Sequence, residues 1–206
     1  MKKITIALVC MLLTAGAAMA QKKFTFGPKI GVDYTHFWGK YLDDYKGAIN
    51  YQAGVFIEYR FSNKFAIAPE VVFAAQGGKY DYDIYDEHGI VIGPNEGTHS
   101  YNVNYINVPV MLKYYIIPSL SIDLGPQLGI NVYSKATDKE PNEFNCGTTD
   151  IKDETKAIDF GVGLGMTYNI TNDVFVQGRY TLGLTSVFEW GENKNGNAQI
   201  AIGYRF

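Results

Sequence analysis

The sequence predicts an all-β protein: a closed, eight-stranded, antiparallel up-and-down transmembrane β-barrel with a polar, plugged interior. Three observations support this fold class. Eight segments alternate between apolar and polar side chains with the two-residue period of a strand. The connections between these segments are alternately short and long. The apolar faces carry bulky side chains, whereas the opposite faces carry glycine and charges of both signs.

Residues 1–20 come first in chain order and match a cleaved signal peptide. Lys2 and Lys3 precede an uncharged apolar stretch that is too short to span a bilayer, and Ala18-Met19-Ala20 is a typical cleavage site. Cleavage would leave residues 21–206 as one barrel domain and would change the formal net charge from −3 to −5. The acidic balance argues against a nucleic-acid-binding protein.

Strict apolar/polar alternation defines the strands of the mature chain. The last strand is the clearest, because one face carries Ala198, Ile200, Ile202, Tyr204 and Phe206. The eight predicted strands are residues 24–37, 48–61, 64–77, 101–117, 119–133, 157–170, 173–187 and 197–206.

The connections favour a meander with two unlike ends. Ser62-Asn63, Pro118-Ser119 and Thr171-Asn172 are predicted tight turns. Short turns on one side and long connections on the other are typical of an outer-membrane barrel, which requires an even number of strands. The long polar connections are predicted at 38–47, 77–100, 134–156 and 188–196.

Side-chain size decides which face points outward. The apolar face contains no Asp, Glu, Lys or Arg, and it holds far more bulky side chains than an eight-stranded interior can accommodate. It therefore has to face lipid, which places the protein in the outer membrane. The opposite, lumen-facing set contains ten glycines: 27, 31, 54, 125, 129, 161, 163, 165, 183 and 203.

The lumen-facing set also contains five cations and five anions, which predicts a network of ion pairs that plugs the barrel. A water-filled pore is disfavoured, because barrels with aqueous channels have roughly 16 or more strands. Gly161, Gly163 and Gly165 would leave room for Arg179 opposite them. The predicted network consists of Lys29, Asp33, Glu58, Arg60, Glu70, Lys113, Asp123, Asp159, Arg179 and Arg205.

Four prolines fit the strand pattern poorly, because a closed barrel has no free edge for a residue without an N–H. We expect bulges or strand ends near the rims at Pro28, Pro69, Pro109 and Pro126.

No cofactor or metal site emerges from the motifs. The glycines at 161, 163 and 165 lack the spacing and the strand-to-helix context of a dinucleotide fingerprint. Cys146 has no second cysteine in the mature chain, so an internal disulfide and a cysteine zinc site are excluded. The acidic run over residues 81–87, with His88 and His99, is either a solvated loop or a site for a divalent cation.

An enzyme is disfavoured, because no nucleophile and base are placed together. Asp43, His36, His99 and Ser100 all lie near predicted rims, but no short motif joins them.

The long connections carry an excess of acidic side chains, with 15 Asp and Glu against 8 Lys. This excess indicates either simple solubility, cation-bridged contact with lipopolysaccharide, or binding of a basic protein partner. The tyrosines that flank these connections are expected in a membrane-interface girdle, with a recognition surface as the alternative. They are Tyr41, Tyr45, Tyr80, Tyr82, Tyr85 and Tyr101.

Three segments, Asn107–Tyr115, Asp159–Tyr168 and Gly178–Thr185, resemble the PorT-like outer-membrane barrel family of Bacteroidetes. The closing Tyr204-Arg205-Phe206 resembles the C-terminal signal that such proteins present to the barrel-assembly machinery. The resemblance covers essentially the whole mature chain. It implies a non-enzymatic barrel in a family whose founding member is linked to protein secretion and maturation, and it supplies no functional residue.

The expected function is a non-catalytic barrel with a structural or surface-interaction role in the cell envelope. Two alternatives stay open: an accessory role in protein secretion, and a narrow pore or small-ligand binder. The expected partners are outer-membrane lipid and lipopolysaccharide, the assembly machinery, and a protein that contacts the acidic loops. We expect a monomer.

Overall fold

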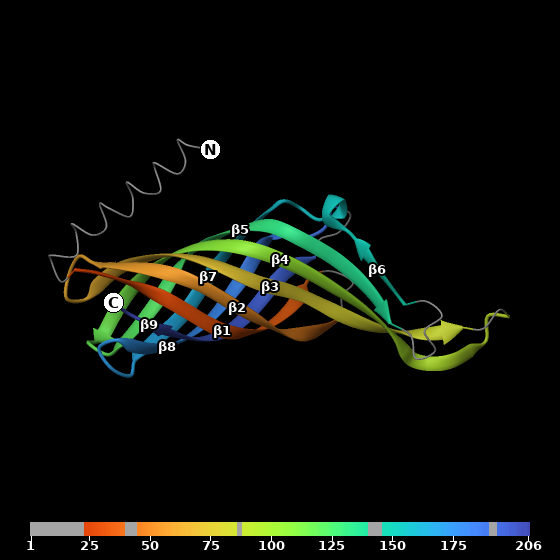
Figure 1. Cartoon of the computed structure of the whole chain (residues 1–206), viewed down its shortest axis with the longest axis horizontal. Helices are drawn as coiled ribbons and strands as arrows, with labels where there is room; N and C mark the ends of the chain where they lie inside the picture. Colours follow the sequence, from red (N-terminus) through yellow and green to blue (C-terminus); the bar gives the residue numbers. More distant parts are fainter. Residues whose placement is uncertain (1–22, 40–44, 86–87, 140–145, 190–192) are drawn as a thin grey trace.

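A computed structural model describes residues 23–39, 45–85, 88–139, 146–189 and 193–206. The predicted signal peptide, residues 1–20, lies outside this part of the chain. The barrel strands are β1 Phe24–Trp38, β2 Tyr45–Arg60, β3 Phe65–Tyr85, β4 Val91–Ile117, β5 Leu120–Lys139, β7 Ile158–Asn169, β8 Val174–Ser186 and β9 Lys194–Tyr204. A short strand, β6 Gly147–Asp150, and the 3-10 turn η1 Lys152–Glu154 lie at one end of the barrel (Figure 1).

The eight long strands form a closed antiparallel ring. Each strand pairs with its neighbour in sequence, with β6 bypassed by the pairing of β5 with β7. The ring closes where β1 meets β9, from Lys29 opposite Gly203 to Trp38 opposite Lys194. The predicted eight-stranded up-and-down barrel is therefore confirmed. Within the described residues, none of the helical structure is long and apolar enough to cross a membrane.

The apolar faces point outward, as the side-chain sizes predict. Ile30 is 61% exposed, Ile200 is 63% exposed and Phe206 is 62% exposed on the outer surface. Their neighbours on the other parity, such as Lys29 and Ala201, are buried inside. A continuous outward apolar surface of this kind is stable in lipid and not in water.

The three predicted short turns lie at one end of the barrel. The hydroxyl residues Ser62 and Thr171 stabilise two of them. Ser62 Oγ accepts the N–H of Phe65 at 2.9 Å, and Thr171 Oγ1 accepts the N–H of Val174 at 2.9 Å. Such side-chain bonds replace the backbone bonds that a turn leaves unmade. The chain ends at the same end of the barrel, where Phe206 N–H donates to Phe26 O at 2.8 Å.

At the opposite end, one of the predicted long loops is largely strand and a second is partly strand. β3 continues to Tyr85 and β4 begins at Val91. Most of the segment 77–100 therefore forms a hairpin that projects beyond the barrel (Figure 1). β5 continues to Lys139 and pairs there with β6. The alternation Tyr80-Asp81-Tyr82-Asp83 explains the error, because a strand with polar side chains resembles a loop in composition.

The strand prolines also correct an expectation. Pro69 lies opposite Val110, Pro109 lies opposite Gln127, and the register on either side of each pair is the same. Register shifts occur elsewhere, for example where Tyr133 follows Val132 in β5. The ladder therefore passes these prolines without a bulge.

Candidate functional site

The lumen gathers most of the predicted charged residues. Eight of the ten have side chains in ion pairs, and all but Arg60 of these eight are buried. The alternation of the strands places these side chains inside, because residues of one parity share one face. The pairs form two clusters, one around Glu70 and one around Glu58.

The first cluster lies deep in the barrel. Arg179 Nη2 donates to Glu70 Oε1 at 2.6 Å, and Arg179 Nη1 donates to Glu70 Oε2 at 3.0 Å. Lys29 Nζ donates to the same Oε2 at 2.6 Å and to Gln177 Oε1 at 3.0 Å. One carboxylate therefore bridges two cations from β1 and β8, in the bidentate geometry that makes such pairs strong.

The second cluster lies nearer the short turns. Glu58 Oε2 is 3.2 Å from Lys113 Nζ and 3.8 Å from Arg205 Nη2, and its Oε1 accepts from Tyr115 OH at 2.5 Å. Arg60 Nη2 reaches Oε1 at 3.3 Å. Glu58 is thus the common partner of three cations.

Gln177 connects the two clusters. It accepts from Lys29, and its Nε2 donates to Asp123 Oδ2 at 3.3 Å. Asp123 in turn lies 3.8 Å from Lys113 and accepts the hydroxyl of Ser121 at 2.6 Å. The contacts form one continuous polar chain from Arg179 to Arg205.

Two predicted members of the network have no ion pair within the described residues. Both carboxylate oxygens of Asp33 are buried without a hydrogen-bond partner. Asp159 accepts from Thr185 at 2.5 Å and from Asn195 at 2.9 Å, both of which are neutral. The predicted network contains equal numbers of cations and anions, but not all of them form ion pairs. The two unpaired acids lie toward the projecting end, and the cations exceed the acids near the short turns.

Glycine provides the space that Arg179 occupies. A Cβ on Gly163 would lie 3.3 Å from Arg179 Cδ, and one on Gly165 would lie 3.1 Å from its Cα. A Cβ on Gly203 would lie 2.3 Å from Phe175 Cζ, so the Phe175 ring occupies the space that a side chain at position 203 would need. Small residues on one strand thus admit large ones from the next.

Aromatic residues of the lumen were missed by the sequence reasoning. Phe56 and Phe175 meet edge to face at 5.1 Å, Arg205 lies 4.4 Å over the Phe175 ring, and Arg60 lies 3.9 Å over the Tyr115 ring. Their parity gave the signal, since each lies on the face of its strand that also carries charged side chains: Glu58 beside Phe56, Arg179 near Phe175 and Lys113 beside Tyr115. Guanidinium groups over rings are held in place by the quadrupole of the ring.

An apolar cluster lies inside the barrel toward the projecting end, and it was also missed. Phe37, Tyr101 and Phe188 pack with ring centroids 5.1–6.3 Å apart. Ile151 and Val187, from outside the barrel strands, join Val103, Tyr105 and Ala136 in this cluster. The interior is therefore filled by an apolar layer above the ion pairs, in addition to the charges.

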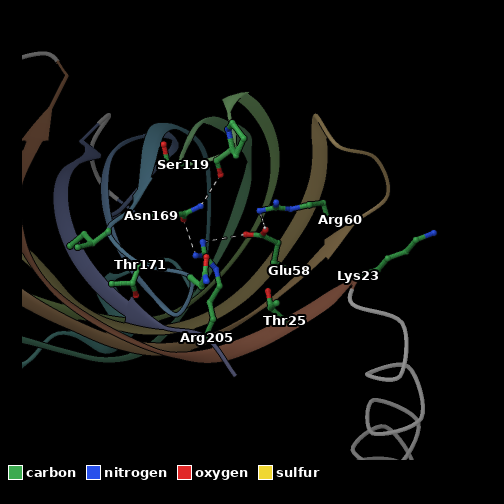
Figure 2. Close-up of a pocket in the computed structure, with 11 residues that line it drawn as sticks. Lys23, Thr25, Glu58, Arg60, Ser119, Asn169, Thr171 and Arg205 are labelled. Carbon is green, nitrogen blue, oxygen red and sulfur yellow. Dashed lines mark hydrogen bonds and ion pairs between the residues drawn. The ribbon is translucent and has the colours of Figure 1, made fainter.

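A polar cavity of about 640 Å³ opens at the short-turn end. Glu58, Arg60, Asn169 and Arg205 line it, and Figure 2 shows Arg205 between Glu58 and Asn169. Arg205 Nη1 donates to Asn169 Oδ1 at 2.8 Å. In outer-membrane barrels the short turns face the periplasm, so we expect this cavity to open to that side.

The structure does not bring together the candidate catalytic residues that it describes, which are His36, His99 and Ser100. His99 Nδ1 contacts Asp138 Oδ1, whereas the adjacent Ser100 points to the other face of β4. His36 lies on the outer surface beside Tyr180, 3.5 Å from its hydroxyl. Asp43 lies outside the described residues.

The acidic run 81–87 begins within the last part of β3, where Asp81 forms polar contacts within the sheet. Asp81 accepts from Lys46 Nζ at 2.6 Å and from Thr98 Oγ1 at 3.0 Å, and these bonds lower the pKa of its carboxyl. Asp86 and Glu87 lie outside the described residues. In the part of the chain that the structure covers, no three His, Cys, Asp or Glu side chains gather into a possible metal site.

Tyr204 and Phe206 both lie on the outer surface next to β1. Their rings meet edge to face at 5.0 Å, and Phe206 lies 5.4 Å from Phe26. Their role as an assembly signal stays a prediction.

Comparison with known proteins agrees with this architecture. The crystal structure of Neisserial surface protein A aligns with a TM-score of 0.54 at 12% identity, over 88% of this chain and 97% of that chain. A major outer membrane protein from Thermus thermophilus aligns with a TM-score of 0.50 at 13% identity, over 89% and 99%. Such identities show the fold alone.

No curated protein matches the chain significantly. The family model described as outer membrane protein beta-barrel domain matches residues 19–189, which is most of the sequence. The protein is therefore located in the outer membrane and belongs to the outer membrane protein β-barrel domain family.

Proposed function

We propose that this protein is a non-catalytic, surface-interaction barrel of the cell envelope whose recognition element is the sheet that projects beyond the barrel. The projecting sheet consists of residues 79–85 of β3, 91–100 of β4, 135–139 of β5, and β6. The length of the strands carries the proposal. β4 has 27 residues, whereas a membrane crossing takes roughly 9–11.

The side chains of the projecting sheet suit recognition. Tyr80 stacks on His99 at 5.2 Å, His99 meets Tyr101 at 4.6 Å, and Tyr80 lies 6.3 Å from Tyr82. Tyrosine offers a large contact area with a polar tip and little flexibility, which is why it is enriched in binding surfaces. Tyr85, 58% exposed at the end of β3, places a further ring at the far end.

The filled lumen supports this role over a pore. Ion pairs occupy its middle, and the apolar cluster around Phe188 occupies its outer end. We infer that the protein does not conduct ions in planar bilayers. Steady single-channel conductance would favour the alternative of a narrow pore.

We also propose that the chain is a PorT-like barrel. The segments that resemble this family form most of the barrel-spanning parts of β4, β7 and β8. An accessory role in protein secretion would use the same projecting sheet, with a secretion component as its partner.

A shortened hairpin tests the proposal. Residues 83–96 are replaced by Asn-Gly between Tyr82 and Gly97, which lie opposite each other in the ladder, so that a two-residue turn closes the hairpin. The barrel should still show heat-modifiable gel mobility. A photo-crosslinker at Tyr80 should lose the product that the full-length hairpin gives in intact cells.

A crosslinker at Phe61, which is exposed at the short-turn end, provides the matched control. It should not give that product. If the product survives the shortening, or if Phe61 gives it too, the projecting sheet is not the recognition element.

A further inference from the structure

Beside the cavity at the short-turn end, the cations gathered around Glu58 outnumber the acids. Glu58 is shared by Lys113, Arg60 and Arg205 at 3.2, 3.3 and 3.8 Å, and Lys113 has one further acid, Asp123, at 3.8 Å. Three cations thus meet two carboxylates. Because most of these charged side chains are buried from solvent, the uncompensated positive charge favours a bound anion.

Arg205 is the cation with unused capacity. It is 6% exposed, yet among the residues that the structure describes its Nε and Nη2 find no hydrogen-bond partner, and its Nη1 donates to Asn169. A guanidinium presents five donors in a rigid fork. Leaving buried donors of a charged group unpaired is costly, so they are expected to find an acceptor.

The two guanidinium groups are held in position before any ligand arrives. Arg205 lies over the Phe175 ring and Arg60 over the Tyr115 ring, at 4.4 and 3.9 Å. Both line the cavity together with the hydroxyl residues Thr25, Ser119 and Thr171. Figure 2 shows that the Lys23 side chain points away from this group.

We propose that this cavity binds an oxyanion, the phosphate or carboxylate group of a small molecule, with Arg205 and Arg60 as its cationic ligands. Paired acceptor oxygens match the guanidinium fork bidentately. A volume of about 640 Å³ lies in the range of small-molecule sites. Glu58 competes with the ligand for both arginines, since it is the carboxylate that both of them contact.

Titration of the full-length mature protein in maltoside micelles tests the site. Inorganic phosphate, and separately acetate, replaces chloride at constant ionic strength, while NMR follows the arginine Nε–H signals. We expect a saturable shift of the Arg205 signal. Arg60→Gln and Arg205→Gln should each weaken phosphate binding by about tenfold, the effect of one charge-assisted hydrogen bond.

Two further variants make the test specific. Glu58→Gln removes the competing acceptor and should tighten phosphate binding. Lys64→Gln removes an exposed cation from the same rim that does not line the cavity, and it should leave binding within about twofold, because exposed charges are screened. Gel mobility checks that each variant folds. If Arg205→Gln or Glu58→Gln does not fold, the comparison of Arg60→Gln with Lys64→Gln decides, because Arg60 is partly exposed.

Nanodiscs distinguish the source of the oxyanion. If the shift is already present in phosphatidylglycerol nanodiscs and absent in phosphatidylcholine nanodiscs, a lipid headgroup is the ligand. If it requires added phosphate in both, the ligand is a solute. The proposal is overturned if no saturable shift occurs, or if Lys64→Gln weakens binding as much as Arg60→Gln.

Discussion

Arg179 donates two hydrogen bonds to the Glu70 carboxylate, of 2.6 and 3.0 Å, although the two residues lie 109 positions apart in the sequence. Lys29 joins them from a third strand, so one carboxylate ties β1, β3 and β8 together across the lumen. The pair is buried on both sides, with side-chain exposures of 1% and 4%. Its contribution can be measured by removing the carboxylate.

Glu70→Gln should destabilise the barrel strongly, because it leaves two buried cations without their shared partner. Removal of one member of a buried ion pair typically costs about 3–5 kcal/mol. The urea midpoint of the protein in lipid vesicles, followed by tryptophan fluorescence, gives the change. Replacing Lys29, Glu70 and Arg179 together by Met should recover most of it, since apolar residues of similar volume often replace buried charges without loss.

Lys46→Gln is the control, because Lys46 pairs with Asp81 on the projecting sheet and its side chain is 63% exposed. Its midpoint should match the wild type. If Glu70→Gln unfolds at the same urea concentration as this control, the lumen pair is not what stabilises the barrel.

The lipid face and the turns were predictable because they depend on local chemistry. Parity alone places Ile30 outside and Lys29 inside, and hydroxyl residues such as Thr171 complete their own turns. Which cation meets which acid was not predictable. That choice depends on how the tilted strands bring Glu70 to Arg179. A count of charges predicted ion pairs for Asp33 and Asp159 as well, but neither forms one within the described residues.

The ends of the barrel were predicted less well than its wall. The projecting sheet was missed because Tyr80-Asp81-Tyr82-Asp83 has the composition of a loop, although its alternation is that of a strand. The apolar layer was missed because Phe188 and Ile151 lie outside every strand pattern, and only the tertiary structure brings them to the mouth of the barrel.

Gly165→Ala should destabilise the barrel, whereas Gly178→Ala should not. A Cβ on Gly165 would lie 2.6 Å from Gly178 O and 3.1 Å from Arg179 Cα, so the backbone would have to shift. Overpacking of this kind costs typically about 1–3 kcal/mol. Gly178 faces lipid with nothing within 4 Å of an added Cβ. Alanine there should stabilise by roughly 0.4–1 kcal/mol, because it restricts the unfolded chain.

The two glycines lie on directly paired parts of β7 and β8, which makes them matched sites. Urea midpoints of the two variants provide the comparison. Equal midpoints would show that the space at Gly165 is not needed by Arg179.

Acid should loosen the base of the projecting sheet through Asp81. Its pKa is lowered because it accepts from Lys46 and Thr98, so the carboxylate supports these contacts at neutral pH. A lowered pKa in the folded state means that the contribution is present above the unperturbed value of about 3.9 and is lost as the pH falls through the lowered value. Backbone amides at 80–82 should then exchange faster.

Hydrogen exchange between pH 6 and pH 3, corrected for its intrinsic pH dependence, measures this effect. Asp81→Asn should remove the pH dependence and give the faster exchange throughout. Protection that stays constant in the wild type down to pH 3 would contradict the role given to Asp81.

The orientation of the barrel predicts which end is reached from outside the cell. Cys146 is exposed beside β6, at the end with the projecting sheet. A maleimide that does not cross membranes should therefore label it in intact cells, because long connections of outer-membrane barrels face outward. Asn63→Cys in a Cys146→Ser background moves the thiol to a short turn, where labelling should require permeabilised cells. Labelling of residue 63 but not of residue 146 in intact cells would show that the barrel is inserted the other way, with the oxyanion cavity on the outside.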